Sequence, residues 1–123
     1  MHYALQLLGL GVLIGVVDTP WLWLMGASIQ DIFQDVQGGR AMEVRLWAAA
    51  PVYLAVAYTV TQARSASRAF LSGLATYAVY EWTQVVTFDR YPVWFACADS
   101  LWGGCLLACV WLLGANLGLV ERD

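Results

Sequence analysis

The chain has 123 residues, of which 61% are hydrophobic and only 12% are charged, and its mean hydropathy is +0.63. This composition excludes an ordinary soluble domain and indicates a polytopic membrane protein. The net charge of −3 provides no basic patch, so we expect no nucleic-acid partner.

Four apolar stretches follow one another along the chain, at about residues 4–25, 46–62, 69–88 and 93–115. Each is close to the ~20 residues that a helix needs to cross the hydrocarbon core of a bilayer. The connections are too short to hold a soluble module. The sequence therefore predicts one all-α transmembrane domain, residues 1–123, folded as an antiparallel up-down four-helix bundle.

Only the connection between the first and second stretches is long. Within it, apolar residues recur at helical spacing and are opposed by polar ones: Ile29, Ile32, Phe33 and Val36 against Gln30, Asp31, Gln34 and Asp35. This pattern predicts a short amphipathic helix between spans 1 and 2. Such a helix would lie on the membrane surface or cover the mouth of the bundle.

The basic residues are all arginines and are divided almost evenly between the two ends of the predicted bundle. Arg40, Arg45 and Arg90 fall at one end, and Arg64, Arg68, Arg122 and the terminal amine fall at the other. By the positive-inside rule, the small difference favours a multi-pass protein with both termini in the cytoplasm.

Three acids, Asp18, Glu81 and Asp99, lie inside the apolar stretches, where no Lys, Arg or His accompanies them. A carboxylate in hydrocarbon costs at least a few kcal/mol, so intramembrane acids usually face the interior of a bundle. Asp18 and Asp99 share the pattern Asp, hydroxyl residue, any residue, Trp, which places Trp21 and Trp102 three residues after each aspartate.

If the four helices alternate in direction, the three acids share one layer. Each lies six or seven residues from the same membrane face, which corresponds to roughly 9–11 Å at the rise of an α-helix. Donors that could face this layer are Tyr77, Tyr80, Gln84, Trp21, Trp102 and the hydroxyls of Thr19 and Ser100. Without a basic partner, the carboxyls would be protonated unless water or a cation reaches them.

Two interpretations of this layer remain open. In the first, Asp18, Glu81 and Asp99 bind protons or cations, with the tyrosines, Gln84 and the two tryptophans as orienting donors. In the second, a neutral hydrogen-bonded cluster only fixes how the helices pack. No histidine lies in the spans and no nucleophile lies beside a base, so we expect no metal site, no cofactor and no enzymatic activity.

Several phrases resemble the small predicted membrane proteins catalogued as domain of unknown function 2177. They are the run from Ala75 to Gln84, then Tyr91-Pro92, then the run from Ala98 to Gly103. The family signature has Asp, Asn and Trp where this chain has Glu81, Gln84 and Tyr91. The resemblance implies a four-helix integral membrane protein, found in bacteria and some large DNA viruses, and implies no known activity.

The sequence thus supports two classes of function. The first is a proton- or cation-responsive binding or permeation protein. The second is a non-catalytic structural or accessory membrane subunit of a larger assembly or virus particle. In both cases the lipid bilayer is a partner, and either a homo-oligomer or a larger membrane assembly is compatible with four short helices.

Overall fold

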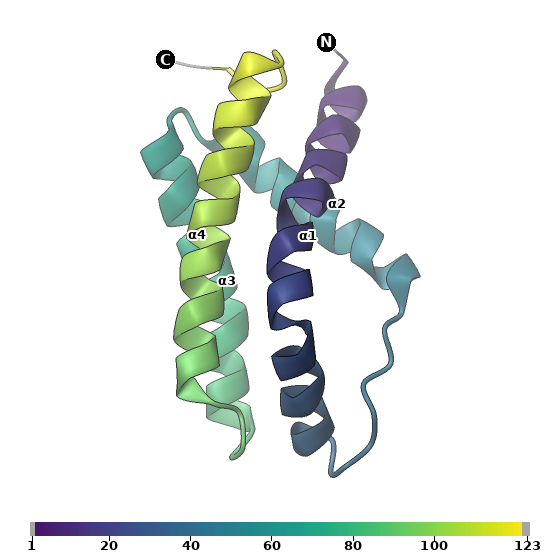
Figure 1. Ribbon diagram of the computed structural model, residues 1–123. Helices are drawn as coiled ribbons and strands as arrows, with labels where there is room; N and C mark the ends of the chain where they lie inside the picture. Colours follow the sequence, from purple (N-terminus) through teal and green to yellow (C-terminus); the bar gives the residue numbers. More distant parts are fainter. Residues whose placement is uncertain (1, 122–123) are drawn as a thin grey trace.

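The computed structural model describes residues 2–121 and is all-α over that range, with no strand among them (Figure 1). The four helices are α1 (Tyr3–Val36), α2 (Leu46–Gln62), α3 (Ala66–Thr87) and α4 (Val93–Asn116). The predicted all-α class and the number of helices are confirmed. Arg122, on which the predicted orientation partly depends, lies outside the described residues.

The tightest helix pair is α3 and α4, and glycine makes their close approach possible. A Cβ added to Gly73 would lie 2.1 Å from the carbonyl oxygen of Gly103, and one added to Gly103 would lie 2.3 Å from the ring of Tyr77. Small residues allow membrane helices to pack with their backbones nearly in contact. This packing fixes the position of Tyr77 and of the α3 face that carries Glu81.

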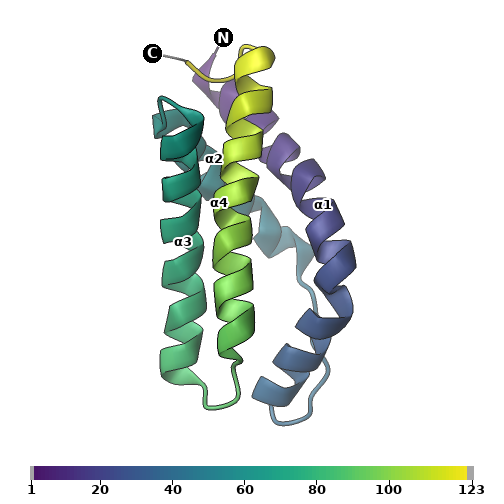
Figure 2. The same cartoon turned by 60° about the vertical axis from the view of Figure 1, so that its left-hand side comes forward.

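α1 is longer than the apolar stretch at its start. Residues 26–36, expected to form a separate amphipathic helix, continue α1 without a break, and the helix ends only before Gly38 and Gly39, which have φ of +70° and +94°. Gly26 did not stop the helix, because an isolated glycine costs a helix only about 1 kcal/mol. α1 bends along its length in Figure 2 and contains Pro20, which removes one backbone hydrogen bond.

The apolar side of this continuation packs against the protein. Ile32 is buried in a small cluster with Tyr91, Phe95 and Ala96, against which Ile29 and Phe33 also pack. The second half of α1 therefore packs beside the α3–α4 turn at this end of the bundle.

α2 is the shortest helix and runs obliquely behind α1 (Figure 1). Its buried residues, Val56, Ala57 and Val60, join the main core with Leu10 and Ile14 of α1 and with buried leucines of α4. α2 packs mainly against α1 and only lightly against α3. α4 contributes more buried residues than any of the other three helices, so it is the central helix.

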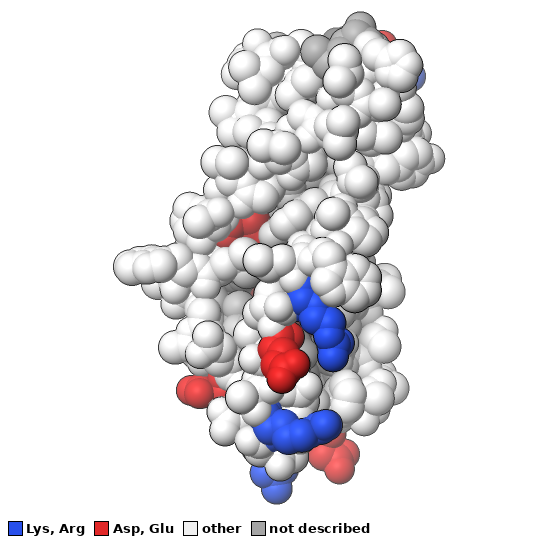
Figure 3. Space-filling model, turned by 90° about the vertical axis from the view of Figure 1, so that its right-hand side faces the viewer, with Lys and Arg blue, Asp and Glu red and all other residues white. Residues whose placement is uncertain are grey.

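Much of the surface is apolar. α1 and α4 are the helices of the described chain that are long and apolar enough to cross a membrane, and only 22% and 44% of their most apolar windows are buried. On the face shown in Figure 3, charged side chains gather towards one end, and an isolated acidic patch lies within the uncharged middle. Large side chains such as Val79 and Val86 are exposed, which suits contact with lipid.

Candidate functional site

Two Asp-x-x-Trp motifs meet between α1 and α4 and exchange partners. The Nε1–H of Trp21 donates to Oδ1 of Asp99 over 3.0 Å, and the Nε1–H of Trp102 donates to Oδ1 of Asp18 over 2.7 Å. Within each motif, a spacing of three residues puts the acid and the indole on the same helix face. Each aspartate is therefore held by the tryptophan of the opposite helix.

The two indoles of this exchange also stack on each other. The ring centroids of Trp21 and Trp102 are 5.2 Å apart, and the ring planes differ by 7°. Aromatic pairs in contact contribute about 0.5–1.5 kcal/mol beyond the burial of their area. Two hydrogen bonds and one stack thus join the middle of α1 to α4, and we refer to these four residues as the Asp–Trp clasp.

Asp18 has a third partner on α2. The hydroxyl of Tyr53 donates to Oδ2 of Asp18 over 3.0 Å, so both oxygens of this carboxyl accept a hydrogen bond. Asp18 is 6% exposed. Two neutral donors, the hydroxyl of Tyr53 and the indole of Trp102, therefore hold the Asp18 carboxyl.

Glu81 on α3 is 1% exposed, and the hydroxyl of Tyr91 donates a short hydrogen bond to its Oε2. The Glu81 and Asp99 carboxyls line the same cavity and lie close enough to interact electrostatically. Two ionised carboxylates in such a position repel each other, so a proton on one of them favours the arrangement. This arrangement makes Glu81 and Asp99 a pair.

Tyr91 lies in the turn between α3 and α4, outside the helices. Burial raises the pKa of its phenol, and the hydrogen bond to Glu81 raises that pKa further. The phenol therefore stays protonated at neutral pH and remains a donor to Glu81.

A cavity of about 140 Å³ adjoins the pair. Asp18, Glu81 and Asp99 all line it, together with aromatic side chains that include Trp21, Tyr77 and Tyr80. A second pocket of about 350 Å³ lies between α2 and α3 and shares Tyr77, Tyr80 and Asp99 with the first. Asp99 thus faces both spaces.

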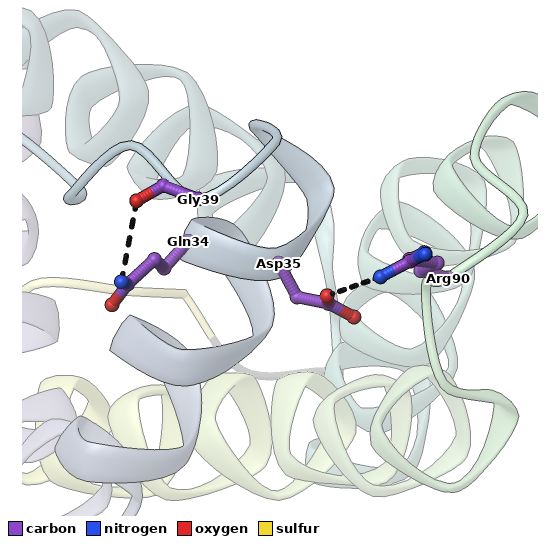
Figure 4. Close-up of polar contacts among 4 residues, drawn as sticks. All are labelled: Gln34, Asp35, Gly39 and Arg90. Carbon is purple, nitrogen blue, oxygen red and sulfur yellow. Dashed lines mark hydrogen bonds and ion pairs between the residues drawn. The ribbon is translucent and has the colours of Figure 1, made fainter.

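Positive charge is confined to the helix ends and turns within residues 2–121. The basic residue in the α3–α4 turn is Arg90, and its Nη1 pairs with Oδ1 of Asp35 over 3.0 Å (Figure 4). This pair joins the last turn of α1 to the α3–α4 turn. Both side chains are largely exposed, so the pair contributes at most about 1 kcal/mol to stability.

Most of the candidate residues from the sequence come together here. The three acids, Trp21, Trp102, Tyr77 and Tyr80 all line the cavities or join the clasp. Gln84 does not line either cavity, and the hydroxyls of Thr19 and Ser100 donate instead to carbonyls of their own helices. Within the described part of the chain, no group of three or more acidic, histidine or cysteine side chains could hold a metal ion.

Two further donors reach the site. The sequence places Tyr53 near the acid layer on the second apolar stretch, next to Pro51, but a lone tyrosine beside a proline gives no motif that marks it as a donor. Tyr91 stands at the signature position that holds Trp before Pro92 in the resembling family, and that position was the available signal.

Fold and site together define a class: a four-helix protein with an apolar outer surface, membrane-length helices and a buried layer of carboxyl and indole groups. The chain belongs to the family of predicted membrane proteins DUF2177, whose model matches residues 3–116. That match covers all four helices. Comparisons with curated proteins and with solved structures found no match.

Proposed function

We propose that this protein is a proton-responsive membrane protein in which the Glu81–Asp99 pair is the responding group. The observation that carries the proposal is that these two carboxyls line one cavity whose walls include no basic side chain. A proton is the simplest species that stabilises such a pair.

The proposed response reaches α1 through the clasp. With the pair protonated, the two carboxyls share a hydrogen bond. Loss of that proton places two like charges side by side, and their repulsion displaces Asp99, which accepts from Trp21. The proton that leaves the pair passes into the adjoining cavity. α1 and α4 would then repack around the stacked indoles.

The other titratable groups facing the pair come from every neighbouring element. They are Asp18 on α1, Tyr53 on α2, Tyr77 and Tyr80 on α3, and Tyr91 in the turn. Asp18 is held by two neutral donors, so we assign it a positioning role rather than a responding one. The absence of a converging metal-ligand set among the described residues favours protons over metal cations.

The proposal includes a topology of four crossings in alternating directions, with both termini on the cytoplasmic side. Two observations support the part of it that puts both termini on one side. The side-chain amide of Gln6 at the start of α1 donates to the carbonyl of Leu119 after α4, over 2.6 Å. The start of α1 and the end of α4 also lie at the same end of the molecule in Figures 1 and 2.

A second candidate function is a non-catalytic structural or accessory subunit, alone or in an assembly. The two hydrogen bonds that Asp18 accepts favour this function. A carboxyl that has a donor at each oxygen can serve helix packing alone. In that case the three acids only hold the helices in register.

The pH dependence of thermal stability in detergent separates the two candidates. Glu81→Gln and Asp99→Asn keep a hydrogen-bond acceptor and fix the proton count. From about pH 4 to pH 9, the proton-responsive function predicts a pH-dependent melting temperature that flattens in both variants. Asp35→Asn, which removes an exposed acid, is the matched control and keeps the wild-type profile. If the variants melt lower but retain the wild-type pH profile, the structural function is correct.

A further inference from the structure

The cavity beside the Glu81–Asp99 pair is lined by more than acids. Its walls are largely aromatic, with Trp21, Tyr77, Tyr80, Phe33 and Phe95 around the carboxyls. A cation over the face of an aromatic ring is attracted by the ring quadrupole, and aromatic cages with an acid are a recurrent way of binding organic ammonium groups. The chemistry of the lining is therefore complementary to an organic cation.

The adjoining pocket has a different character. It is mostly apolar, is lined by Val52 and Val56 of α2 and by Thr76 of α3, and reaches Asp99 at its inner end. Val52 and Tyr80 are more than half exposed, so the pocket opens on the outer surface between α2 and α3. At about 350 Å³ it falls within the range of small-molecule sites.

From these two spaces we infer that the protein binds a lipophilic organic cation, with the ammonium head among Asp99, Glu81 and the aromatic rings and the apolar tail in the pocket between α2 and α3. This inference rests on the proposed function, since the cation uses the same pair. An anionic or phosphate-bearing head would meet carboxyls without a basic side chain to balance it. A purely apolar ligand would bring no positive charge to the buried carboxyls.

The proposal also assigns the route of access. A guest reaches the head-group cavity from the side, between α2 and α3, rather than from the α3–α4 end. Towards that end the second half of α1 packs against the α3–α4 turn, where Ile32 is buried with Tyr91 and Phe95. The light packing of α2 against α3 leaves the lateral opening.

Calorimetric titration of the purified protein in non-ionic maltoside micelles tests this inference. The probe is decyltrimethylammonium, and decyl sulfate is the control of the same chain length and opposite charge. We expect saturable binding of the cation alone. Glu81→Gln and Asp99→Asn should each weaken it at least about tenfold, while Asp35→Asn changes it less than about twofold.

A steric variant keeps the test independent of charge. Thr76→Phe adds an aromatic ring to the wall of the lateral pocket without touching an acid. We expect it to weaken decyltrimethylammonium while leaving tetramethylammonium, which has no tail, unchanged. Equal binding of decyl sulfate and decyltrimethylammonium, or unaltered cation binding in Asp99→Asn, overturns the inference.

The outcomes also separate this inference from the proposed function. If the pH profile of stability flattens in the neutral variants and no cation binds, the ligand class is wrong and the proton response stands. If the cation binds through Asp99 while the pH profile is unaffected by either variant, the site is right and the proton response is wrong.

Discussion

Trp21 and Asp99 lie 78 positions apart in the sequence, and the indole Nε1 of the first is 3.0 Å from the carboxyl Oδ1 of the second. The reverse contact, from Trp102 to Asp18, completes an exchange between α1 and α4. Each helix thus supplies one donor and one acceptor to the other. The exchange fixes the register of α1 along α4, whereas the close packing of α3 on α4 sets the distance from Asp99 to Glu81.

The first prediction concerns this exchange. Trp21→Phe keeps an aromatic ring for the stack with Trp102 but removes the donor to Asp99. The bond is partly buried, and such a hydrogen bond contributes about 0.5–1.5 kcal/mol, so the free energy of unfolding in detergent should fall by that amount. Trp23→Phe, on the same helix and 84% exposed, is the control and should change stability by less than about 0.5 kcal/mol. Equal effects of the two variants would show that the bond contributes nothing.

The second prediction concerns the glycine contact of α3 with α4. Gly73→Ala places a methyl group 2.1 Å from the carbonyl oxygen of Gly103, so the helices must separate. Overpacking of this kind costs about 1–3 kcal/mol. At Gly26 in α1 no atom lies within 4 Å of an added Cβ, and Gly26→Ala should instead stabilise the helix by about 0.5–1 kcal/mol. Thermal unfolding of the two variants should show a lower stability than wild type for Gly73→Ala and a higher one for Gly26→Ala.

The third prediction concerns the pH dependence contributed by Tyr91. Burial and the bond to Glu81 raise its pKa in the folded protein above the value of about 10 found in unfolded chains. Its hydrogen bond is therefore fully present at neutral pH, and its contribution declines as the pH rises above about 10, where only the unfolded chain releases this proton. Wild-type protein should lose more stability than Tyr91→Phe between neutral and strongly alkaline pH.

The control for that comparison is Tyr58→Phe on α2, where the side chain is 52% exposed. It should follow the wild-type alkaline profile, because its exposed side chain takes no part in the bond to Glu81. An identical alkaline profile for Tyr91→Phe and the wild type would contradict the buried bond to Glu81.

The fourth prediction concerns the exposed ion pair at the end of the bundle. Arg90→Gln removes the partner of Asp35, and we expect a loss below about 1 kcal/mol that disappears at high salt, since exposed pairs are screened. Unfolding measured at low and high salt checks it. A loss as large as that of Trp21→Phe, unaffected by salt, would mean that this pair rather than buried packing holds the end of α1.

The sequence predicts some helices of this arrangement better than others. Hydropathy gives the helices, because the membrane demands about 20 apolar residues for each. Hydropathy does not predict where α1 ends. The segment after Gly26 keeps helical periodicity, and its packing against Phe95 is seen only in the folded structure. The bounds of α2, in contrast, agree with the apolar stretch, because polar turns follow it directly.

The site shows the same division. The meeting of the three acids follows from their burial in apolar segments, but their partners do not. An Asp-x-x-Trp motif places Trp21 on the face of its own Asp18, and nothing local says that the indole reaches Asp99 instead. The interhelical register decides this, and that register depends on close contacts such as Gly73 against Gly103. Tyr53 and Tyr91 are likewise donors only because α2 and the turn bring them to the layer.

In the proposed function, the Glu81–Asp99 pair carries a proton that it exchanges with its surroundings. Infrared difference spectroscopy of the purified protein across pH measures this directly through the carboxyl stretching bands. We expect a protonated carboxyl band that disappears reversibly as the pH rises, is lost or shifted in Glu81→Gln and Asp99→Asn, and persists in Asp35→Asn. A carboxyl spectrum that does not change with pH while the protein stays folded would contradict it.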